Sequence, residues 1–114
     1  MVTFISCRQH QHTSIPSALL TTQANVYFDG RCVSHSFKTP SGEEKSVGVV
    51  LPATLTFNTA KAEIMECVAG ACEYRLKGQE QWHTVQAGEQ FSIAENSSFD
   101  IKVTDSFHYI CHYA

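Results

Sequence analysis

Residues 58–70 read NTAKAEIMECVAG. In this stretch six residues separate Glu63 from Gly70, the glycine of an Ala69-Gly70 turn signal. The residues after Glu63 include Ile64, Met65 and Val68, which suit a strand better than a loop. Whether this strand and turn belong to a β-barrel depends on the pattern in the rest of the chain.

Turn signals recur at short intervals outside this stretch. They include Asp29-Gly30, TPSGEE, KGQEQ, Ala87-Gly88 and ENSS, and between them lie SVGVVL, ATLTF, CEYRL, QFSIA, FDIKV and FHYICHY. In FDIKV, apolar Phe99, Ile101 and Val103 alternate with two charged residues, the period of a sheet with one wet face. Short strands with almost no helical period predict an all-β fold, a sandwich or a closed barrel.

Composition narrows the class of protein. The 114 residues suffice for one domain, and no apolar run approaches the roughly 18 residues of a membrane span. A net charge of −3 with three scattered arginines argues against a surface for a nucleic-acid polymer. We therefore expect one soluble domain whose partners are small molecules.

The N-terminus and the cysteines indicate where the domain begins and in which compartment the protein resides. Residues 1–24 show no strand or helix period and predict a loosely ordered leader, in which His10 and His12 are incidental, before a domain at 25–114. The five cysteines, Cys7, Cys32, Cys67, Cys72 and Cys111, include no CxxC pair, and no secretion signal precedes them. Free, buried thiols in a cytoplasmic protein are the expectation.

Two incomplete motifs make the chain resemble a small cupin barrel, a jelly roll. In the first cupin motif, G(X)5HxH(X)3,4E(X)6G, Glu63 and Gly70 match, while Phe57 and Thr59 occupy the histidine positions. In the second, G(X)5PxG(X)2H(X)3N, Gly88 matches and Phe99 replaces the histidine. A phenylalanine cannot bind a metal ion, so the resemblance implies a cupin frame without its metal site.

A narrower resemblance covers nearly all of residues 25–114. The segments NVYFDG, SVGV, the Thr56 to Met65 block TFNTAKAEIM, a tryptophan before Ala87-Gly88, and the closing YICHY look like the pyrimidine/purine nucleoside phosphorylase family of small cupins. Ala94 replaces the usual proline, and His112 stands where the resemblance leads us to expect an arginine.

The resemblance implies a broad-specificity transferase, a pentosyltransferase that cleaves purine and pyrimidine nucleosides with inorganic phosphate. No cofactor is implied. Glu63 would face inward and stabilise the positive charge that develops at C1′, and Thr59 would offer a hydroxyl on the same face. Phe57 and Phe99 would form apolar walls for a base.

Other residues are candidates for contact with the substrates. The hydroxyl groups of Tyr27, Tyr109 and Tyr113 would donate hydrogen bonds to phosphate or base. Met65 would contact the sugar. Ser46 and Lys45 would approach phosphate. Without the resemblance, the aromatic residues would be assigned to core filling. If His112 meets phosphate, its affinity should fall as pH rises; strand parity instead puts His112 on the face opposite to Cys111 and Tyr113.

Three functions are compatible with the sequence. The first is the metal-independent phosphorylase, the second is a cupin that binds a nucleoside or sugar without turnover, and the third is a metal-dependent cupin that combines Glu63 with unexpected histidines. Phosphate-dependent release of base separates the first from the others. We also expect a homodimer, because small sheets commonly cover their edges with a second copy.

Overall fold

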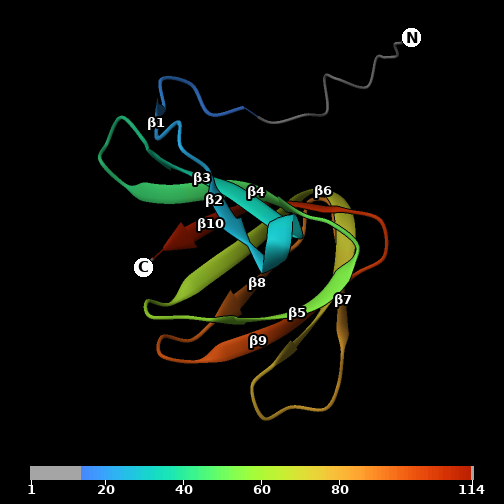
Figure 1. The fold of residues 1–114 in the computed structure, drawn as a ribbon. Coiled ribbons are helices and arrows are strands. Elements are labelled where there is room, and N and C mark those ends of the chain that lie inside the picture. Colours follow the sequence, from blue (N-terminus) through green and yellow to red (C-terminus); the bar gives the residue numbers. More distant parts are fainter. Residues whose placement is uncertain (1–13, 114) are drawn as a thin grey trace, which may run out of the picture.

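The computed structural model describes residues 14–113 as one curled antiparallel sheet of ten strands (Figure 1). The elements are β1 (Leu19–Leu20), β2 (Asn25–Tyr27), the 3-10 turn η2 (Phe28–Gly30), β3 (Cys32–Lys38), β4 (Glu44–Val50), β5 (Ala53–Asn58), β6 (Glu63–Leu76), β7 (His83–Gln86), β8 (Gln90–Ile93), β9 (Ser98–Val103) and β10 (Phe107–Tyr113). The all-β prediction is confirmed. Residues 14–113 contain no helix with the length and apolarity that a membrane crossing needs.

Strand β9 shows how the sequence pattern produces the sheet. Phe99, Ile101 and Val103 are at most 4% exposed, as their alternation predicts. The residues between them point outward, where Asp100 pairs with Arg75 at 2.9 Å and Lys102 with Glu73 at 3.4 Å. One face of the strand therefore builds the core and the other carries ion pairs.

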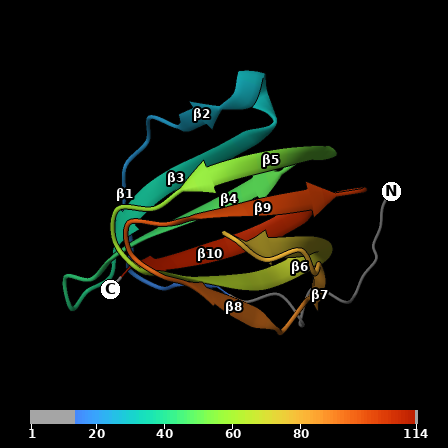
Figure 2. The same ribbon diagram turned by 90° about the horizontal axis from the view of Figure 1, so that it is seen from below.

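The strands follow the order β1-β3-β4-β10-β6-β9-β5, and each pair of neighbours in this order runs antiparallel. The 14-residue β6 holds the two parts of the sheet together. Its first half pairs with β10 and β8, and its second half with β7 and β9. Seen from below, β3, β4 and β10 form one side of the curl, and β5 and β9 lie across from them (Figure 2).

The core fills the inside of this curl. It contains the four described cysteines, which are buried and free, among aliphatic and aromatic residues of both parts of the sheet. Their expected role as small buried hydrophobes is confirmed, while Cys7 lies outside the described residues. Gly70 has a φ of +72°, and a Cβ there would collide with the carbonyl oxygen of Ser106, so this position requires glycine.

The N-terminal segment takes part in the sheet from Leu19. Leu19 pairs with Lys38 and Leu20 with Phe37, so the part of the chain predicted as a leader supplies the short edge strand β1. Asn25, where the domain is predicted to begin, starts β2, which pairs with β3 at Ser34. Residues 1–13, with His10 and His12, and Ala114 lie outside the described residues.

Candidate active site

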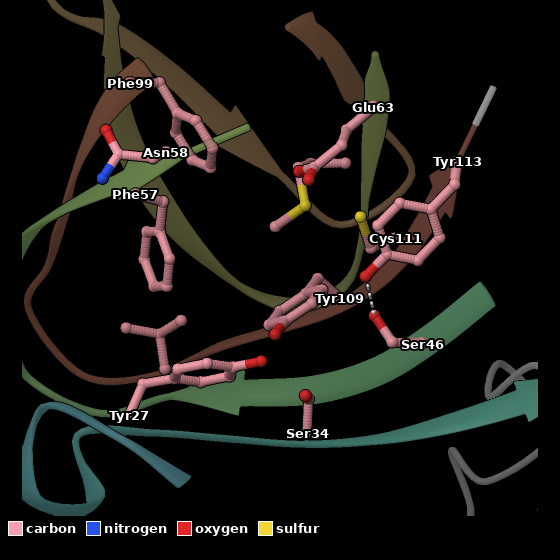
Figure 3. Close-up of a pocket in the computed structure, with 12 residues that line it drawn as sticks. Tyr27, Ser34, Ser46, Phe57, Asn58, Glu63, Phe99, Tyr109, Cys111 and Tyr113 are labelled. Carbon is pink, nitrogen blue, oxygen red and sulfur yellow. Dashed lines mark hydrogen bonds between the residues drawn. The ribbon is translucent and has the colours of Figure 1, made fainter. Parts of the chain in front are cut away.

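A pocket of about 150 Å³ lies inside the curl, between β3, β4 and β10 on one side and β5 and β9 on the other (Figure 3). Eight residues predicted from the sequence line it: Tyr27, Ser46, Phe57, Glu63, Met65, Phe99, Tyr109 and Tyr113. Each of these residues lies in a strand. The pocket as a whole is lined from seven strands rather than from one loop.

Aromatic rings form one end of the pocket. Phe57 and Phe99 are register partners on β5 and β9, and their rings stack with centroids 5.5 Å apart at 21°. Tyr27 meets Phe57 edge-on at 6.4 Å. Asn58 follows Phe57 and adds an amide at this end, which gives a flat apolar surface with one polar group (Figure 3). Such a surface suits a planar heterocycle.

The other end is polar and centres on Glu63, the only carboxylate that lines the pocket within residues 14–113. Burial raises the pKa of Glu63 above its ordinary value, and a hydrogen bond from the Cys111 thiol partly lowers it. Burial and the nearby Glu63 charge raise the pKa of Cys111 to about 12. The thiol is thus a protonated donor at neutral pH and not a nucleophile.

Hydroxyl groups complete the polar end. The Ser46 Oγ and Tyr113 Oη atoms lie 3.1 Å apart, and Ser46 is only 3% exposed (Figure 3). Burial also raises the pKa of Tyr113, so its phenol stays protonated. The Tyr109 Oη atom lies 3.6 Å from the Cys32 Sγ atom, at the floor of the pocket. This end offers donors and one carboxylate, the groups that a ribose and an oxyanion require.

Thr59 and His112, both predicted site residues, do not line the pocket. Strand β5 ends at Asn58, so its alternation does not extend to Thr59. The Thr59 hydroxyl instead donates to the Ala94 carbonyl at 2.7 Å and accepts from the Ser97 N–H at 2.9 Å. Thr59 therefore fastens the loop between β5 and β6 to the turn between β8 and β9.

His112 lies on the outer face of β10, as strand parity indicated. Its Nδ1 atom is 2.7 Å from the Lys45 Nζ atom, and its Nε2 atom is 2.9 Å from Glu66 Oε1. An ammonium group can only donate, so Nδ1 accepts and Nε2 carries the proton that is donated to Glu66. His112 thus bridges two surface side chains outside the pocket.

Four residues that line the pocket were not predicted from the sequence: Ser34, Val50, Asn58 and Cys111. Cys111 shares its inward parity with Tyr109 and Tyr113, so the same alternation would have found it. Ser34 on β3 is the register partner of Gly48 on β4, and Gly48 is the register partner of Tyr109 on β10. This alignment across three strands brings Ser34 to the pocket. No local pattern reveals that alignment.

The residues present do not fit the metal ion that many barrels of this frame hold. Phe57 and Phe99 stand at two histidine positions inside the pocket, and Thr59, at the third, uses its hydroxyl in the loop. Within residues 14–113, no three His, Cys, Asp or Glu side chains come together as a ligand set. Among the described residues that line the pocket, Glu63 alone offers a carboxylate and none offers an imidazole, whereas a typical divalent site in such a barrel needs several such ligands.

Known proteins resemble this chain in sequence over most of its length. The profile of a family described as "Pyrimidine/purine nucleoside phosphorylase" matches residues 22–113. Proteins of that name are 68% identical in Ralstonia pickettii, over 83% of this chain and 90% of the relative, and 62% identical in Delftia acidovorans, over 89% and 96%.

Solved structures show the same fold. A protein of unknown function from Acinetobacter sp. ADP1 superposes with a TM-score of 0.86 at 32% identity, over 89% of this chain and 98% of that one. An RmlC-like cupin from Shewanella frigidimarina superposes with a TM-score of 0.64 at 12% identity, over 90% and 88%. The cupin-like barrel predicted from the motifs is confirmed.

Proposed function

The chain belongs to the pyrimidine/purine nucleoside phosphorylase family, and we propose that it cleaves purine and pyrimidine nucleosides with inorganic phosphate. The observation that carries the proposal is the pocket with one carboxylate at a hydroxyl-rich end and stacked phenyl rings at the other. These two ends match the two halves of a nucleoside, a polyhydroxylated sugar and a flat base.

The reaction exchanges one bond at C1′ for another. An oxygen of phosphate forms the C1′–O bond, while the C1′–N bond breaks and its electron pair leaves with the base, which then takes up a proton. The products are the free base and α-D-ribose 1-phosphate. Positive charge develops on the ribose ring between these events, so the site has to stabilise a cation.

Glu63 is the group suited to stabilise that cation. Its carboxylate sits in the pocket with the Cys111 thiol beside it, and burial strengthens any electrostatic interaction that it makes. Because burial raises the pKa of Glu63, we expect the rate to increase with pH as this carboxyl group ionises. The hydroxyls of Ser46 and Tyr113 are placed to bind sugar oxygens.

Phe57 and Phe99 account for broad specificity. Stacking on a phenyl ring depends on the flat face of a base rather than on its hydrogen-bonding edge, so purines and pyrimidines are both accepted. Asn58, Tyr27 and Met65 surround the substrate as secondary contacts. We propose that the catalysis is independent of metal ions, since the site lacks the donors to bind one.

The enzyme's free cysteines and exposed apolar side chains bear on its compartment and its assembly. It acts as a pentosyltransferase in the cytoplasm, which suits the free cysteines Cys32, Cys67, Cys72 and Cys111. A homodimer would cover exposed apolar side chains such as Leu19 and Leu20, which are 72% and 51% exposed. Size-exclusion chromatography with light scattering tests the dimer.

The decisive experiment measures release of base from uridine and adenosine with and without phosphate. We expect phosphate-dependent release that falls by about two to three decades in Glu63→Gln, the usual effect of losing one preorganised electrostatic group. Glu66→Gln is the matched control, because Glu66 lies on the same strand but bonds to His112 on the outer face. Saturable nucleoside binding without turnover would instead indicate a binding protein.

A further inference from the structure

A second pocket, of about 420 Å³, adjoins the polar end of the first one. The two share Glu63 and Tyr113 as common lining residues. The second pocket lies between the β3–β4 hairpin and the loop that joins β5 to β6. Figure 3 shows Glu63 and Tyr113, the two shared residues, across the first pocket from Phe57 and Phe99. A ligand in the second pocket would therefore reach the reacting centre from the end opposite to the phenyl rings.

The charge of this second pocket differs from that of the first. Lys38 and Lys61 line it, whereas none of the described lysines or arginines lines the first pocket. Lys38 lies 3.9 Å from the Glu44 carboxylate, and both side chains are more than half exposed, which makes the pair weak. Within the described part of the chain, Lys61 has no acidic side chain within 4.0 Å.

Lys45 also borders this pocket, but its ammonium group is already bonded to His112 at 2.7 Å. The hydroxyl residues Thr21 and Ser36 line the pocket beside Lys38. Two cations with hydroxyl donors are the chemistry that recognises a tetrahedral oxyanion. The carboxylates of Glu44 and Glu63, which also line the pocket, oppose such an anion.

We propose that the inorganic phosphate of the reaction binds in this second pocket, between Lys38 and Lys61. This inference rests on the proposed function, because it assigns a place to the second substrate of the same reaction. Phosphate bound there faces C1′ of a ribose held at Glu63, while the base stacks at Phe57. The C1′–O bond then forms on one side of the sugar as the C1′–N bond breaks on the other.

The loop that carries Lys61 is held in place by Thr59. Its two hydrogen bonds, to Ala94 and from Ser97, fix the chain two residues before Lys61, and the Asn96 N–H donates to the Ala60 carbonyl at 3.2 Å. The ammonium group of Lys61 is thus presented from a restrained backbone. Thr59 is a positioning residue for the phosphate site.

The test compares Michaelis constants for phosphate and for nucleoside in four variants. We expect Lys38→Ala and Lys61→Ala to raise the phosphate KM roughly tenfold each, the effect of losing a charge-assisted hydrogen bond, with little change in the nucleoside KM. Glu44→Gln should lower the phosphate KM roughly two- to fivefold, because it releases Lys38 from its acidic partner. Lys77→Ala is the matched control, since Lys77 is exposed beyond the far end of β6.

A misplaced phosphate site and a wrong proposed function would give different experimental results. If the wild-type protein cleaves nucleosides but both lysine variants keep its phosphate KM, the phosphate site lies elsewhere and only the inference is refuted. An equal rise in Lys77→Ala would also refute it, by showing a general effect of surface charge. If the wild-type protein cleaves nothing, titration with inorganic phosphate by calorimetry still decides: heat of binding that is lost in Lys61→Ala supports the site, and its absence in the wild type refutes it.

Discussion

Replacing Gly48 with alanine should damage both the stability of the protein and its pocket. Gly48 lies in the middle of β4, aligned with Ser34 on β3 and with Tyr109 on β10. A Cβ atom there would stand 2.7 Å from the Tyr109 Oη atom, 2.8 Å from its Cζ atom and 2.7 Å from the Val33 carbonyl oxygen. Carbon atoms do not approach this closely, so the Tyr109 ring and the strand must both move.

The size of the effect follows from these three contacts. Overpacking of a filled interior costs roughly 1–3 kcal/mol, and the carbonyl of Val33 cannot rotate away as a side chain would. At about 4–8 °C for each kcal/mol in a domain of this size, Gly48→Ala should lower Tm by roughly 5–20 °C. Because Tyr109 lines the pocket, the nucleoside KM should rise as well.

Calorimetric unfolding and nucleoside kinetics on the same preparation check both effects. The control is Tyr109→Phe, which removes the hydroxyl that the new methyl group would meet. In that background, Gly48→Ala should cost less than in the wild type, with the remaining cost due to the ring and the Val33 carbonyl. A Gly48→Ala protein with wild-type Tm and nucleoside KM would refute the conclusion that Tyr109 packs directly on this glycine.

Three further predictions concern metals, His112 and acid. Chelators should leave phosphorolysis unchanged, and loss of activity that one metal restores would contradict this. His112→Ala and His112→Arg should keep the nucleoside KM, since His112 bonds to Lys45 and Glu66 outside the first pocket; a raised nucleoside KM in both variants would contradict this. Hydrogen bonds from Thr56 and Arg75 lower the pKa of Asp100, so its stabilising effect is present above about pH 4 and is lost as pH falls through its folded pKa. The wild type should therefore exceed Asp100→Asn in urea midpoint at pH 7, and equal midpoints at pH 7 would contradict the prediction.

Strand alternation and motif spacing predict part of the candidate site from the sequence. Glu63, Phe57 and Phe99 line the pocket as predicted because each lies within a regular strand, where parity fixes the side that a residue faces. The prediction for Thr59 was wrong, because Thr59 lies one residue beyond the end of β5 at Asn58, where strand parity no longer applies. A strand end is a local event that hydrophobic periodicity does not resolve.

The other residues of the candidate site could not be predicted, because their place depends on which strands pair in the sheet. Ser34 enters the pocket only because β3 and β10 both pair with β4, and β10 is distant from both in the sequence. The second pocket likewise joins Lys38 on β3 to Lys61 in a loop. Pairings between distant segments leave no trace in local composition, so the sequence alone could not bring these two lysines together.

The position of β10 also has a consequence for biosynthesis. This strand is the last one described, yet it is inserted between β4 and β6 and pairs with both. While a ribosome is still extending the chain, β4 and β6 therefore have exposed backbone edges that only the final segment can cover. Such edges recruit other nascent strands, and non-local pairings form slowly. The nascent chain should consequently depend on holding chaperones until Tyr113 has emerged, and polypeptides truncated before Phe107 should aggregate instead of folding.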